Sequence, residues 1–524
     1  MIDGDMQAFA LTLDRFLDHA AKWRPDVEVI TAGEAGTIDR IGYAELRRRS
    51  LRVSGVLAGL GVGRGDRVAT LAWNTRAHVE AWYAIMGMGA VCHTLNPRLT
   101  EAQLASMVGQ SGARILIASA DLAPLARRVA ARTPSLDRVL MIDLPADAAV
   151  PAGDALEPMI AAAGDGVWGG FEETAPCGLC FTSGTTGAPK GVTYTHRSSF
   201  LHTLRLLQAD VMAITAADTV LTAVPMFHAN AWGLPFAAPA AGARLVLPGR
   251  ELDGASLARL INGEGVTLAV GIATVWLGLV EHLEAAGGET PTLSRVIVGG
   301  APMAPALMER IERRLGVTVQ TSWGMTEMSP LGVCAPPHDP ARSAQVSGRP
   351  AFGVDLLLTD AEGRPLAEQR GVEGHLRVRG PAVVERYFGE ADSATDAEGW
   401  FGTGDLARID PDGDLIITGR AKDLIKSGGE WINPAEIEAV VNEHPLVSLA
   451  AVIGRPDPKW GERPILVVQT RDADGVTDED ILSPLRDRVA PWWIPDAVIR
   501  LEQMPLASTG KIDKMRLRVD YGGC

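Results

Sequence analysis

The sequence predicts an α/β protein with a large N-terminal domain of α/β subdomains, a small β-barrel-like part and a smaller α+β C-terminal domain. Three observations support this. The chain has 524 residues, which is too long for one ordinary core. Strand-like and helix-like segments alternate through its first three hundred residues, roughly, as in sheets with covering helices. Beyond Arg420 a compact unit of short strands and helices follows, of normal domain size.

The alternation begins with an apolar run that starts at Arg67. The expected strands are 67–73, 113–118, 177–181, 243–247, 268–272 and 295–298, and the expected helices are 78–88, 121–131 and 257–262. Short apolar runs that alternate with helical patterns favour parallel sheets. No repeat of fixed period accompanies them.

Three later segments complete the expected architecture. Residues 146–173 are rich in Ala, Gly, Asp and Pro, which indicates a surface connection between subdomains. Residues 353–379 hold short β-rich pieces broken by Gly and Pro. The last unit is expected to contain helices 434–442 and 478–488 and strands 448–453 and 464–469. We expect an N-terminal domain over 1–421 and a C-terminal domain over 422–524.

Composition and charge exclude several classes of protein. Apolar residues make up 47% and charged residues 22%, which is typical of a globular chain. The 49 basic and 64 acidic side chains give a net charge of -15, which disfavours binding to nucleic acid or anionic lipid. The first residues lack the pattern of a secretory signal, and the apolar stretch 268–280 is too short for a transmembrane segment. We therefore expect a cytoplasmic protein.

The five cysteines do not form the pattern of a disulfide framework. Cys177 and Cys180 make a CxxC pair, which could indicate zinc or redox chemistry. A zinc site needs a second pair of ligands at suitable spacing, and none follows. The interpretation is therefore buried thiols at the start of a strand.

The segment 181–191 reads Phe-Thr-Ser-Gly-Thr-Thr-Gly-Ala-Pro-Lys-Gly. Its glycines let backbone amides approach an anion, its hydroxyls donate hydrogen bonds, and Lys190 adds a positive charge. It is not a Walker loop, because the lysine does not stand at the required spacing. A flexible surface loop is the alternative that composition allows.

This loop resembles the phosphate-binding motif of the adenylate-forming (ANL) superfamily, which contains acyl-CoA synthetases, peptide-synthetase adenylation domains and luciferases. Four more stretches resemble the superfamily's motifs in the same order. They are Trp323–Glu327 (WGMTE), Gly399–Asp405 (GWFGTGD), the pair 419–426 (GRAKDLIK) and 434–438 (PAEIE), and Pro505–Lys511 (PLASTGK). Five ordered motifs run through most of the chain, so chance agreement is very improbable.

The resemblance implies a nucleotide site built from these motifs. Asp405 would accept the ribose hydroxyls, Arg420 would contact ribose and phosphate, and Glu327 would hold Mg²⁺. Trp323 stands where the superfamily more often has Tyr and would offer an aromatic face to adenine. The implied ATP- and AMP-binding residues are Thr182, Ser183, Gly184, Thr185, Thr186, Lys190, Gly300, Ala301, Pro302, Trp323, Gly324, Met325, Thr326, Asp405 and Arg420.

The same resemblance implies a two-step ligase with ATP, Mg²⁺ and coenzyme A. Lys511 would bridge the carboxylate and the phosphate while an acyl-adenylate forms. The C-terminal domain would then rotate about a hinge at Lys422. In place of the lysine, the rotation would present Gly428, Gly429 and Trp431 to the pantetheine arm of CoA.

The acyl site is expected around the segment 225–233 (PMFHANAWG), which resembles the medium- and long-chain fatty acyl-CoA synthetase branch. There Trp232 would gate the acyl tunnel and His228 would lie near the carboxylate. Gly271, in an apolar segment with small side chains, would line the same site. A fatty acid is the expected substrate. A short thioether acid such as 3-methylmercaptopropionate, or an aromatic acid, is the alternative. The branch also suggests a homodimer.

Three other functions remain as alternatives. A carrier-protein-loading enzyme would keep every ATP motif, but no carrier domain follows Lys511. A regulator that binds acyl-adenylate without turnover is disfavoured by the intact Lys190 and Glu327. The glycine-rich stretch Gly61–Gly65 (GVGRG) could suggest a dinucleotide-binding oxidoreductase. However, this stretch precedes a strand and has the wrong glycine spacing.

Overall fold

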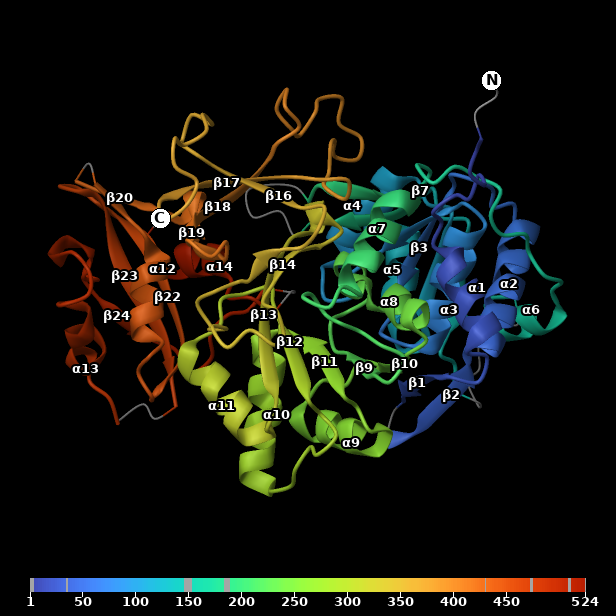
Figure 1. Cartoon of the computed structure of the whole chain (residues 1–524), viewed down its shortest axis with the longest axis horizontal. Coiled ribbons are helices and arrows are strands. Elements are labelled where there is room, and N and C mark those ends of the chain that lie inside the picture. The colour runs from blue at the N-terminus through green and yellow to red at the C-terminus, as the bar shows by residue number, and fades with distance from the viewer. Residues whose placement is uncertain are drawn as a thin grey trace.

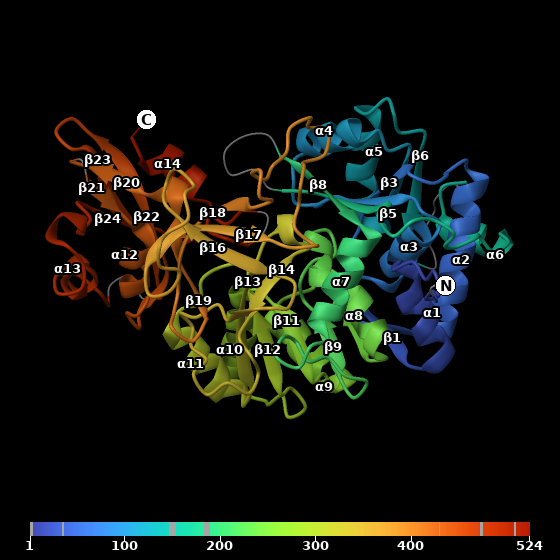
Figure 2. The same ribbon diagram turned by 45° about the horizontal axis from the view of Figure 1, so that its top comes forward.

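The structure is a computed structural model that describes residues 4–33, 36–145, 153–182, 189–428, 430–471, 475–507 and 510–523. Two large sheets with their helices make up most of the chain, and the C-terminal unit lies at one end of the molecule (Figure 1). A small sheet lies beside that unit, and the view in Figure 2 shows it between the unit and the large body. The expected α/β architecture is confirmed.

The first sheet has six strands within the described residues, in the order β6-β5-β3-β4-β7-β8. All neighbours are parallel except β7 and β8. Its elements are β3 (Arg67–Leu71), β4 (Val91–Thr94), β5 (Ile115–Ser119), β6 (Arg138–Ile142), β7 (Pro176–Phe181) and β8 (Gly191–Thr195), with α2 (Tyr43–Gly59), α3 (Arg76–Gly87), α4 (Glu101–Ser111), α5 (Ala123–Ala131), α6 (Leu156–Ala162) and α7 (His196–Leu206). Strands such as β5 are buried throughout, as expected for parallel strands covered on both faces.

The second sheet, over the same described ranges, has nine strands in the order β15-β14-β13-β12-β11-β9-β10-β1-β2. Its centre is parallel, and its two ends are antiparallel. The elements are β1 (Glu28–Ala32), β2 (Ile38–Gly42), β9 (Thr219–Thr222), β10 (Arg244–Leu247), β11 (Leu268–Gly271), β12 (Arg295–Val298), β13 (Thr318–Gly324), β14 (Leu331–Cys334) and β15 (Arg349–Pro350), with α1 (Asp14–Trp23), α8 (Leu234–Ala241), α9 (Gly254–Glu264), α10 (Ala273–Ala286) and α11 (Pro305–Leu315).

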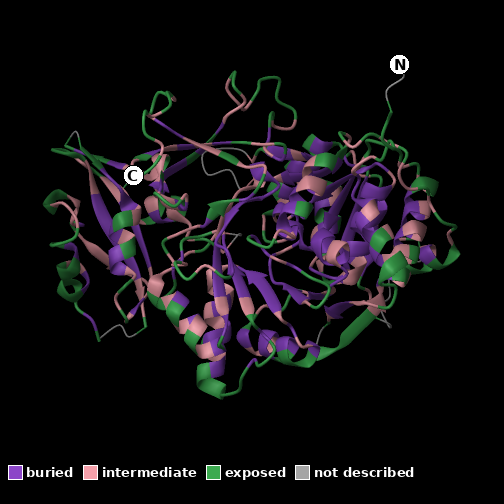
Figure 3. Ribbon diagram, in the orientation of Figure 1, coloured by how far each residue is buried: buried purple, intermediate pink, exposed green. Residues whose placement is uncertain are grey.

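The two large sheets share one apolar core. Val68 and Ile117 from the first sheet and Leu245 and Val270 from the second are members of a single buried cluster. A second cluster lies between the nine-stranded sheet and α9, α10 and α11. Figure 3 shows the buried strands running through the middle of the large body. The sheets therefore form a rigid base for the loops at their edges.

Two smaller sheets follow. The strands β16 (Asp355–Thr359), β17 (Glu373–Arg379), β18 (Phe401–Ile409) and β19 (Leu415–Arg420) form an antiparallel sheet. The C-terminal unit contains β20 (Ile425–Ser427), β21 (Glu430–Ile432), β22 (Val447–Asp457), β23 (Gly461–Thr470), β24 (Val498–Arg500), α12 (Pro434–Val441), α13 (Asp478–Leu482) and α14 (Lys514–Tyr521). Its two buried clusters contain only residues from Ile425 onward. The domain boundary at 421/422 stays a prediction.

Most expected elements are present, and two differ. The helix expected over 478–488 ends at Leu482, and Pro484 lies in a separate short 3₁₀ turn over Ser483–Leu485. The connection 146–173 contains α6, while residues 146–152 lie outside the described residues. Cys177 and Cys180 are buried in β7, and loss of hydration raises their pKa values to about 12 and about 11. No described helix combines the length and apolar character of a membrane span.

Candidate active site

The phosphate loop joins β7 to β8, at the carboxyl end of β7 where parallel sheets commonly bind ligands. Its base is closed by a hydrogen bond from Thr182 N to Lys190 O of 2.9 Å. Ser183, Gly184, Thr185 and Thr186 lie outside the described residues. Lys190 is exposed, and its Nζ lies 4.7 Å from the centroid of the Tyr387 ring.

Glu327 lies in a 3₁₀ turn over Thr326–Met328, directly after β13. Its side chain is buried, and Oε1 accepts a 2.9 Å hydrogen bond from Tyr387 Oη. The carbonyl of Thr326 accepts a 2.8 Å bond from Tyr194 Oη in β8. Gly324 permits this tight path, since a Cβ there would lie 2.2 Å from Pro330 O. The hydrogen bond from Tyr194 thus ties the turn that carries Glu327 to β8, the strand that follows the phosphate loop.

The donor set fits a magnesium ion that is held mainly by phosphates and water. Among the described residues, no group of three or more His, Cys, Asp or Glu side chains could hold a metal ion. Mg²⁺ often keeps several waters and takes only one or two carboxylates together with substrate phosphates. Glu327, which lies near the phosphate-loop lysine through their shared neighbour Tyr387, can supply one such carboxylate.

Asp405 and Arg420 face each other across β18 and β19, where they are direct register partners. Arg420 Nε lies 2.7 Å from Asp405 Oδ1, and Trp323 Nε1 donates a 3.1 Å bond to Oδ2. Burial raises the pKa of Asp405, and the Arg420 charge, the Trp323 bond and Lys511 oppose this. The structure therefore brings together three residues that the sequence assigned separately to ribose and adenine. The indole N–H of Trp323 points to the carboxylate.

The segment expected to line adenine follows β12. Gly300 has φ of 82°, and Ala301 and Pro302 are exposed. A Cβ on Gly300 would lie 3.8 Å from the Trp232 ring and 3.9 Å from Lys511 Cε. The loop after β12 thus meets both the predicted acyl gate and the C-terminal lysine.

Lys511 reaches this place on a tight turn of the C-terminal unit. Lys511 O accepts a 2.7 Å bond from Ala507 N, and Gly510 has φ of 80°. A Cβ on Gly510 would lie 2.5 Å from Ile272 Cδ1, so the turn packs directly on the large body. Lys511 is exposed to water, and many protein atoms surround it. Loss of hydration and then the Arg420 charge lower its pKa.

The predicted acyl segment contains an unusual left-handed turn. Ala229, Asn230, Ala231 and Trp232 have φ between 44° and 52°, a region that non-glycine residues rarely adopt. The turn holds the Trp232 ring against the loop after β12, where a Cβ on Gly299 would lie 2.9 Å from it. Cys180 Sγ in β7 donates a 3.3 Å bond to Asn230 Oδ1. This bond links the acyl segment to the strand before the phosphate loop.

Two more predicted acyl-site residues lie around that segment. His228 is half-buried, and loss of hydration together with the Lys511 charge lowers its pKa to about 4. Gly271 ends β11 and is buried. The side of Gly271 that would carry a Cβ faces the Trp276 ring at 2.9 Å, so side-chain packing fills the space on that face.

The predicted hinge and CoA-side residues lie apart from these contacts. Lys422 is exposed in a short 3₁₀ turn after β19. Trp431 is 54% exposed, and Lys426 of the same hairpin lies 5.4 Å from its ring centroid. Gly428 is exposed, and Gly429 lies outside the described residues. The structure thus places Lys511 next to Gly300, whereas the Trp431 side chain is largely exposed to water.

Sequence reasoning missed Tyr387 and Tyr194. Each hydroxyl bonds to the turn that carries Glu327, yet each residue lies in a stretch with no recognised motif. The available signal was an aromatic residue in a polar segment, Glu385-Arg-Tyr387. Aromatic side chains with a polar tip usually find a hydrogen-bond partner when they are buried.

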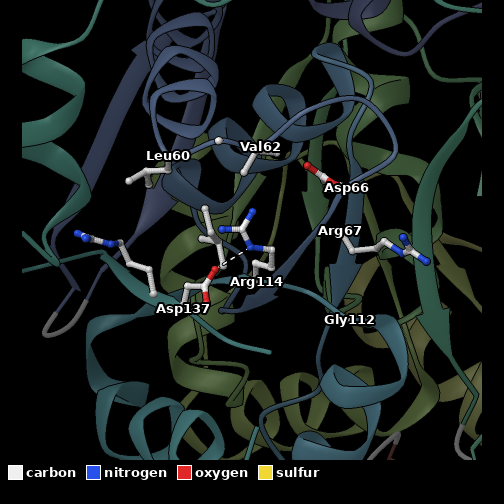
Figure 4. A pocket seen from close by; sticks show the side chains of 10 residues that line it. Leu60, Val62, Asp66, Arg67, Gly112, Arg114 and Asp137 are labelled. Atoms are coloured by element: carbon white, nitrogen blue, oxygen red, sulfur yellow. Dashed lines mark hydrogen bonds and ion pairs between the residues drawn. The ribbon is translucent and has the colours of Figure 1, made fainter. Parts of the chain in front are cut away.

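A surface pocket of about 230 Å³ lies away from this site, at the amino ends of β3, β5 and β6 (Figure 4). Leu60, Val62 and Ile115 supply apolar walls. Arg114 beside it pairs with Asp137 at 2.7 Å. Its place is opposite to the phosphate loop, because that loop follows the carboxyl end of a parallel strand of the same sheet.

Comparisons with known proteins show the family to which the chain belongs. The AMP-binding enzyme model matches residues 17–388, and the AMP-binding enzyme C-terminal domain model matches 436–511. A long-chain-fatty-acid–CoA ligase of Thermus thermophilus is 40% identical, covering 98% of this chain and 96% of its own. A 3-methylmercaptopropionyl-CoA ligase of Ruegeria lacuscaerulensis is 39% identical, covering 99% and 98%. ATP-bound MatB from Rhodopseudomonas palustris is 26% identical, with a TM-score of 0.86 over 98% of this chain and 99% of its own. The chain therefore belongs to the AMP-binding enzyme family, within the adenylate-forming superfamily of acyl-CoA synthetases.

Proposed function

We propose that this protein is an AMP-forming acid–CoA ligase that activates a medium- or long-chain fatty acid with ATP and transfers the acyl group to CoA. The position of Lys511 is the observation that supports this most directly. The C-terminal unit brings this lysine next to Gly300, and its pKa responds to the charges of Arg420 and Asp405. Adenylate formation needs a cationic side chain where the anionic acid meets the anionic α-phosphate.

In the first step, a carboxylate oxygen of the acid attacks the α-phosphorus of ATP. A new P–O bond forms, the bond to the β-phosphate oxygen breaks, and pyrophosphate leaves. Both reactants are anionic, so fixed positive groups should lower the barrier. Lys511 meets the carboxylate and the α-phosphate in this proposal, while Asp405 holds the ribose hydroxyls and Lys190 holds the phosphates.

The same step is proposed to use Mg²⁺, which supplies positive charge at the phosphate oxygens when it is bound. Glu327 would hold the ion with one carboxylate. The hydroxyl of Thr326 lies in the same turn and would donate to the α-phosphate. Trp323 supports the nucleotide from the other side while its N–H keeps Asp405 in place.

In the second step, the sulfur of CoA attacks the acyl carbon. A C–S bond forms, the bond from the acyl carbon to the phosphate oxygen breaks, AMP leaves with the electron pair, and the thiol proton is released to water. The pKa of about 4 keeps the His228 ring neutral at neutral pH, so it can accept a hydrogen bond from the incoming thiol. We propose that rotation about Lys422 brings Gly428, Gly429 and Trp431 to this step.

The substrate has two candidates because relatives of nearly equal identity carry different names. A fatty acid is supported by the apolar acyl segment and by the buried Trp232 near its end. A short thioether acid is supported by the packing of Trp276 on Gly271, which fills space that a long chain would need on that face of β11. The first candidate carries the proposal.

The test is pyrophosphate release over a panel of acids, with and without CoA. The panel contains octanoate, palmitate, 3-methylmercaptopropionate and benzoate. We expect AMP and pyrophosphate as products, with kcat/KM highest for octanoate or palmitate. Formation of ADP would contradict the proposed reaction. A preference for the thioether acid would support the proposed reaction but contradict the fatty acid as its substrate.

The branch resemblance also suggests a homodimer, which we propose as the state in solution. The check is light scattering coupled to size exclusion. A mass of one chain at micromolar concentration would contradict it.

A further inference from the structure

A segment that joins β17 to β18 crosses from the small sheet to both large sheets. We define residues 382–388 as the connecting strap. Its first part is tied to the turn of Glu327, because Val384 N donates a 2.7 Å bond to Glu327 O and Ser329 Oγ donates a 3.0 Å bond to Ala382 O. Its last part is tied to β8, because Phe388 N donates a 2.8 Å bond to Gly191 O. The strap thus connects the Glu327 turn with the exit of the phosphate loop.

Tyr387 lies near the end of the strap and contacts both functional groups. Its hydroxyl donates to Glu327 Oε1 at 2.9 Å, and its ring centroid lies 4.7 Å from Lys190 Nζ. Phe401 packs edge-on against the same ring at 6.4 Å, which limits its movement.

Glu327 follows β13 of the nine-stranded sheet, and Lys190 precedes β8 of the six-stranded sheet. Tyr387 contacts both residues. The hydroxyl of Tyr387 occupies one oxygen of the carboxylate and leaves the second oxygen for a ligand. Its ring holds the lysine ammonium by a cation–π contact without neutralising its charge. A single side chain therefore fixes the anion and the cation relative to each other.

We propose that Tyr387 is a positioning residue that holds Glu327 and Lys190 at the separation needed to grip metal-bound triphosphate from both sides. This inference rests on the proposed use of ATP and Mg²⁺. It assigns a role to the connecting strap, which carries none of the five recognised motifs. The hydroxyl acts on the metal side, and the ring acts on the phosphate side.

The two halves of the side chain can be tested separately. Tyr387→Phe keeps the ring and removes the hydroxyl, whereas Tyr387→Leu removes both. The readout is binding of α,β-methylene-ATP, an unreactive analogue, measured by calorimetry with and without Mg²⁺. The ratio of the two dissociation constants reports the coupling between metal and nucleotide.

We expect Tyr387→Phe to reduce this coupling ratio about tenfold, as for loss of a hydrogen bond to a charged group, and to leave metal-free binding within roughly twofold. Tyr387→Leu should also weaken metal-free binding by about two- to fivefold, since the cation–π contact is lost as well. Equal effects of Phe and Leu, or an unchanged ratio in both, would overturn the inference.

A matched control and a double mutant separate positioning from folding. Tyr43→Phe removes another tyrosine hydroxyl bond, 2.6 Å to Ala243 O, far from the site. It should lower the melting temperature and leave the coupling ratio unchanged. In a Glu327→Gln background, Tyr387→Phe should no longer change the ratio, because the hydroxyl acts through that carboxylate. An undiminished effect in that background would contradict positioning.

The binding assay contains neither acid nor CoA, so its outcome is independent of the proposed ligase reaction. The wild-type protein could bind the analogue with Mg²⁺ coupling and yet release no pyrophosphate with any acid of the panel. In that case the proposed function fails and the role of Tyr387 stands. If nucleotide binding shows no Mg²⁺ coupling in the wild type, the role of Tyr387 fails, whatever the turnover.

Discussion

The proposed ribose side and the lysine side of this site are built in different ways. Asp405 and Arg420 are cross-strand partners in one sheet, and Trp323 completes their contacts. Lys511 instead arrives on a turn of the C-terminal unit that packs on the large body around Ile272. The first arrangement is fixed by backbone register. The second depends on how one unit is placed against another, so it can be broken without disturbing the nucleotide site.

The largest expected effect is on the ribose side. Asp405→Asn removes the proposed ribose acceptor and leaves Arg420 without its ion pair. We expect kcat/KM for ATP to fall about a thousandfold, roughly 4 kcal/mol. Asp414→Asn is the matched control, because Asp414 is also a buried aspartate paired with an arginine, Arg349, at 3.4 Å. The control should lose stability and keep kcat/KM. A similar loss of kcat/KM in both variants would contradict a specific role of Asp405 in binding ATP.

The next effect is on the lysine side and should be confined to one half-reaction. Lys511→Ala should slow adenylate formation by about 30- to 1000-fold, or 2 to 4 kcal/mol. Conversion of a supplied acyl-adenylate with CoA should stay near the wild-type rate. Lys514→Ala is the control, since Lys514 pairs with Glu438 at 2.7 Å within the C-terminal unit. Equal slowing of both half-reactions by Lys511→Ala would contradict two separate conformations.

A smaller expected effect is the influence of the Lys511 charge on the pKa of His228 in the predicted acyl segment. Lys511 helps to lower the pKa of His228 to about 4, below the ordinary value of 6.5. Between these values the unfolded chain binds a proton that the folded chain does not, so stability falls as the pH falls through this window. In Lys511→Ala the pKa of His228 should rise but remain below 6.5, because loss of hydration is the larger cause. NMR titration of the His228 ring measures this pKa. An unchanged value would show that the Lys511 charge does not act on His228.

The smallest expected effect concerns the left-handed turn of the acyl segment. Ala231 has φ of 48°, which costs an L-residue about 1–2 kcal/mol, whereas glycine adopts it readily. Ala231→Gly should therefore raise unfolding free energy by roughly 0.5 to 1 kcal/mol, since the greater freedom of unfolded glycine offsets part of the gain. Thermal unfolding measures it. Ala241→Gly, at the end of α8, is the control and should be destabilising. A loss of stability in Ala231→Gly would show that the turn is unstrained.

The sequence predicted the repeating parts of the fold because they depend on local pattern. The strands at 67–71 and 268–271 are short apolar runs, and each such strand can be predicted from its own residues. The helix after Asp478 was predicted too long, because its pattern continues past Pro484 while its backbone does not. The left-handed turn was not expected, since three of its four residues are ordinary L-residues that normally avoid it.

Single motifs allowed individual site residues to be proposed, whereas contacts between distant segments were missed. Asp405 was proposed from the motif 399–405, but its bond to Trp323 joins residues 82 positions apart. Tyr387 has no motif of its own, and its role depends on Glu327 and Lys190 lying on either side of it. Contacts of this kind are set by how the sheets are stacked, which no local pattern records.

The cross-strand pair of Asp405 and Arg420 also sets where this protein can be lengthened. The hairpin between β18 and β19 turns at Asp410–Asp414, where Asp410 N and Asp414 O form a 3.0 Å bond. One residue inserted there would shift β19 by one position and carry Arg420 to the opposite face of the sheet. The link from β16 to β17 fixes no such pair of site residues. Engineered tags or peptide epitopes therefore belong in residues 360–372, and the turn at 410–414 should keep its native length.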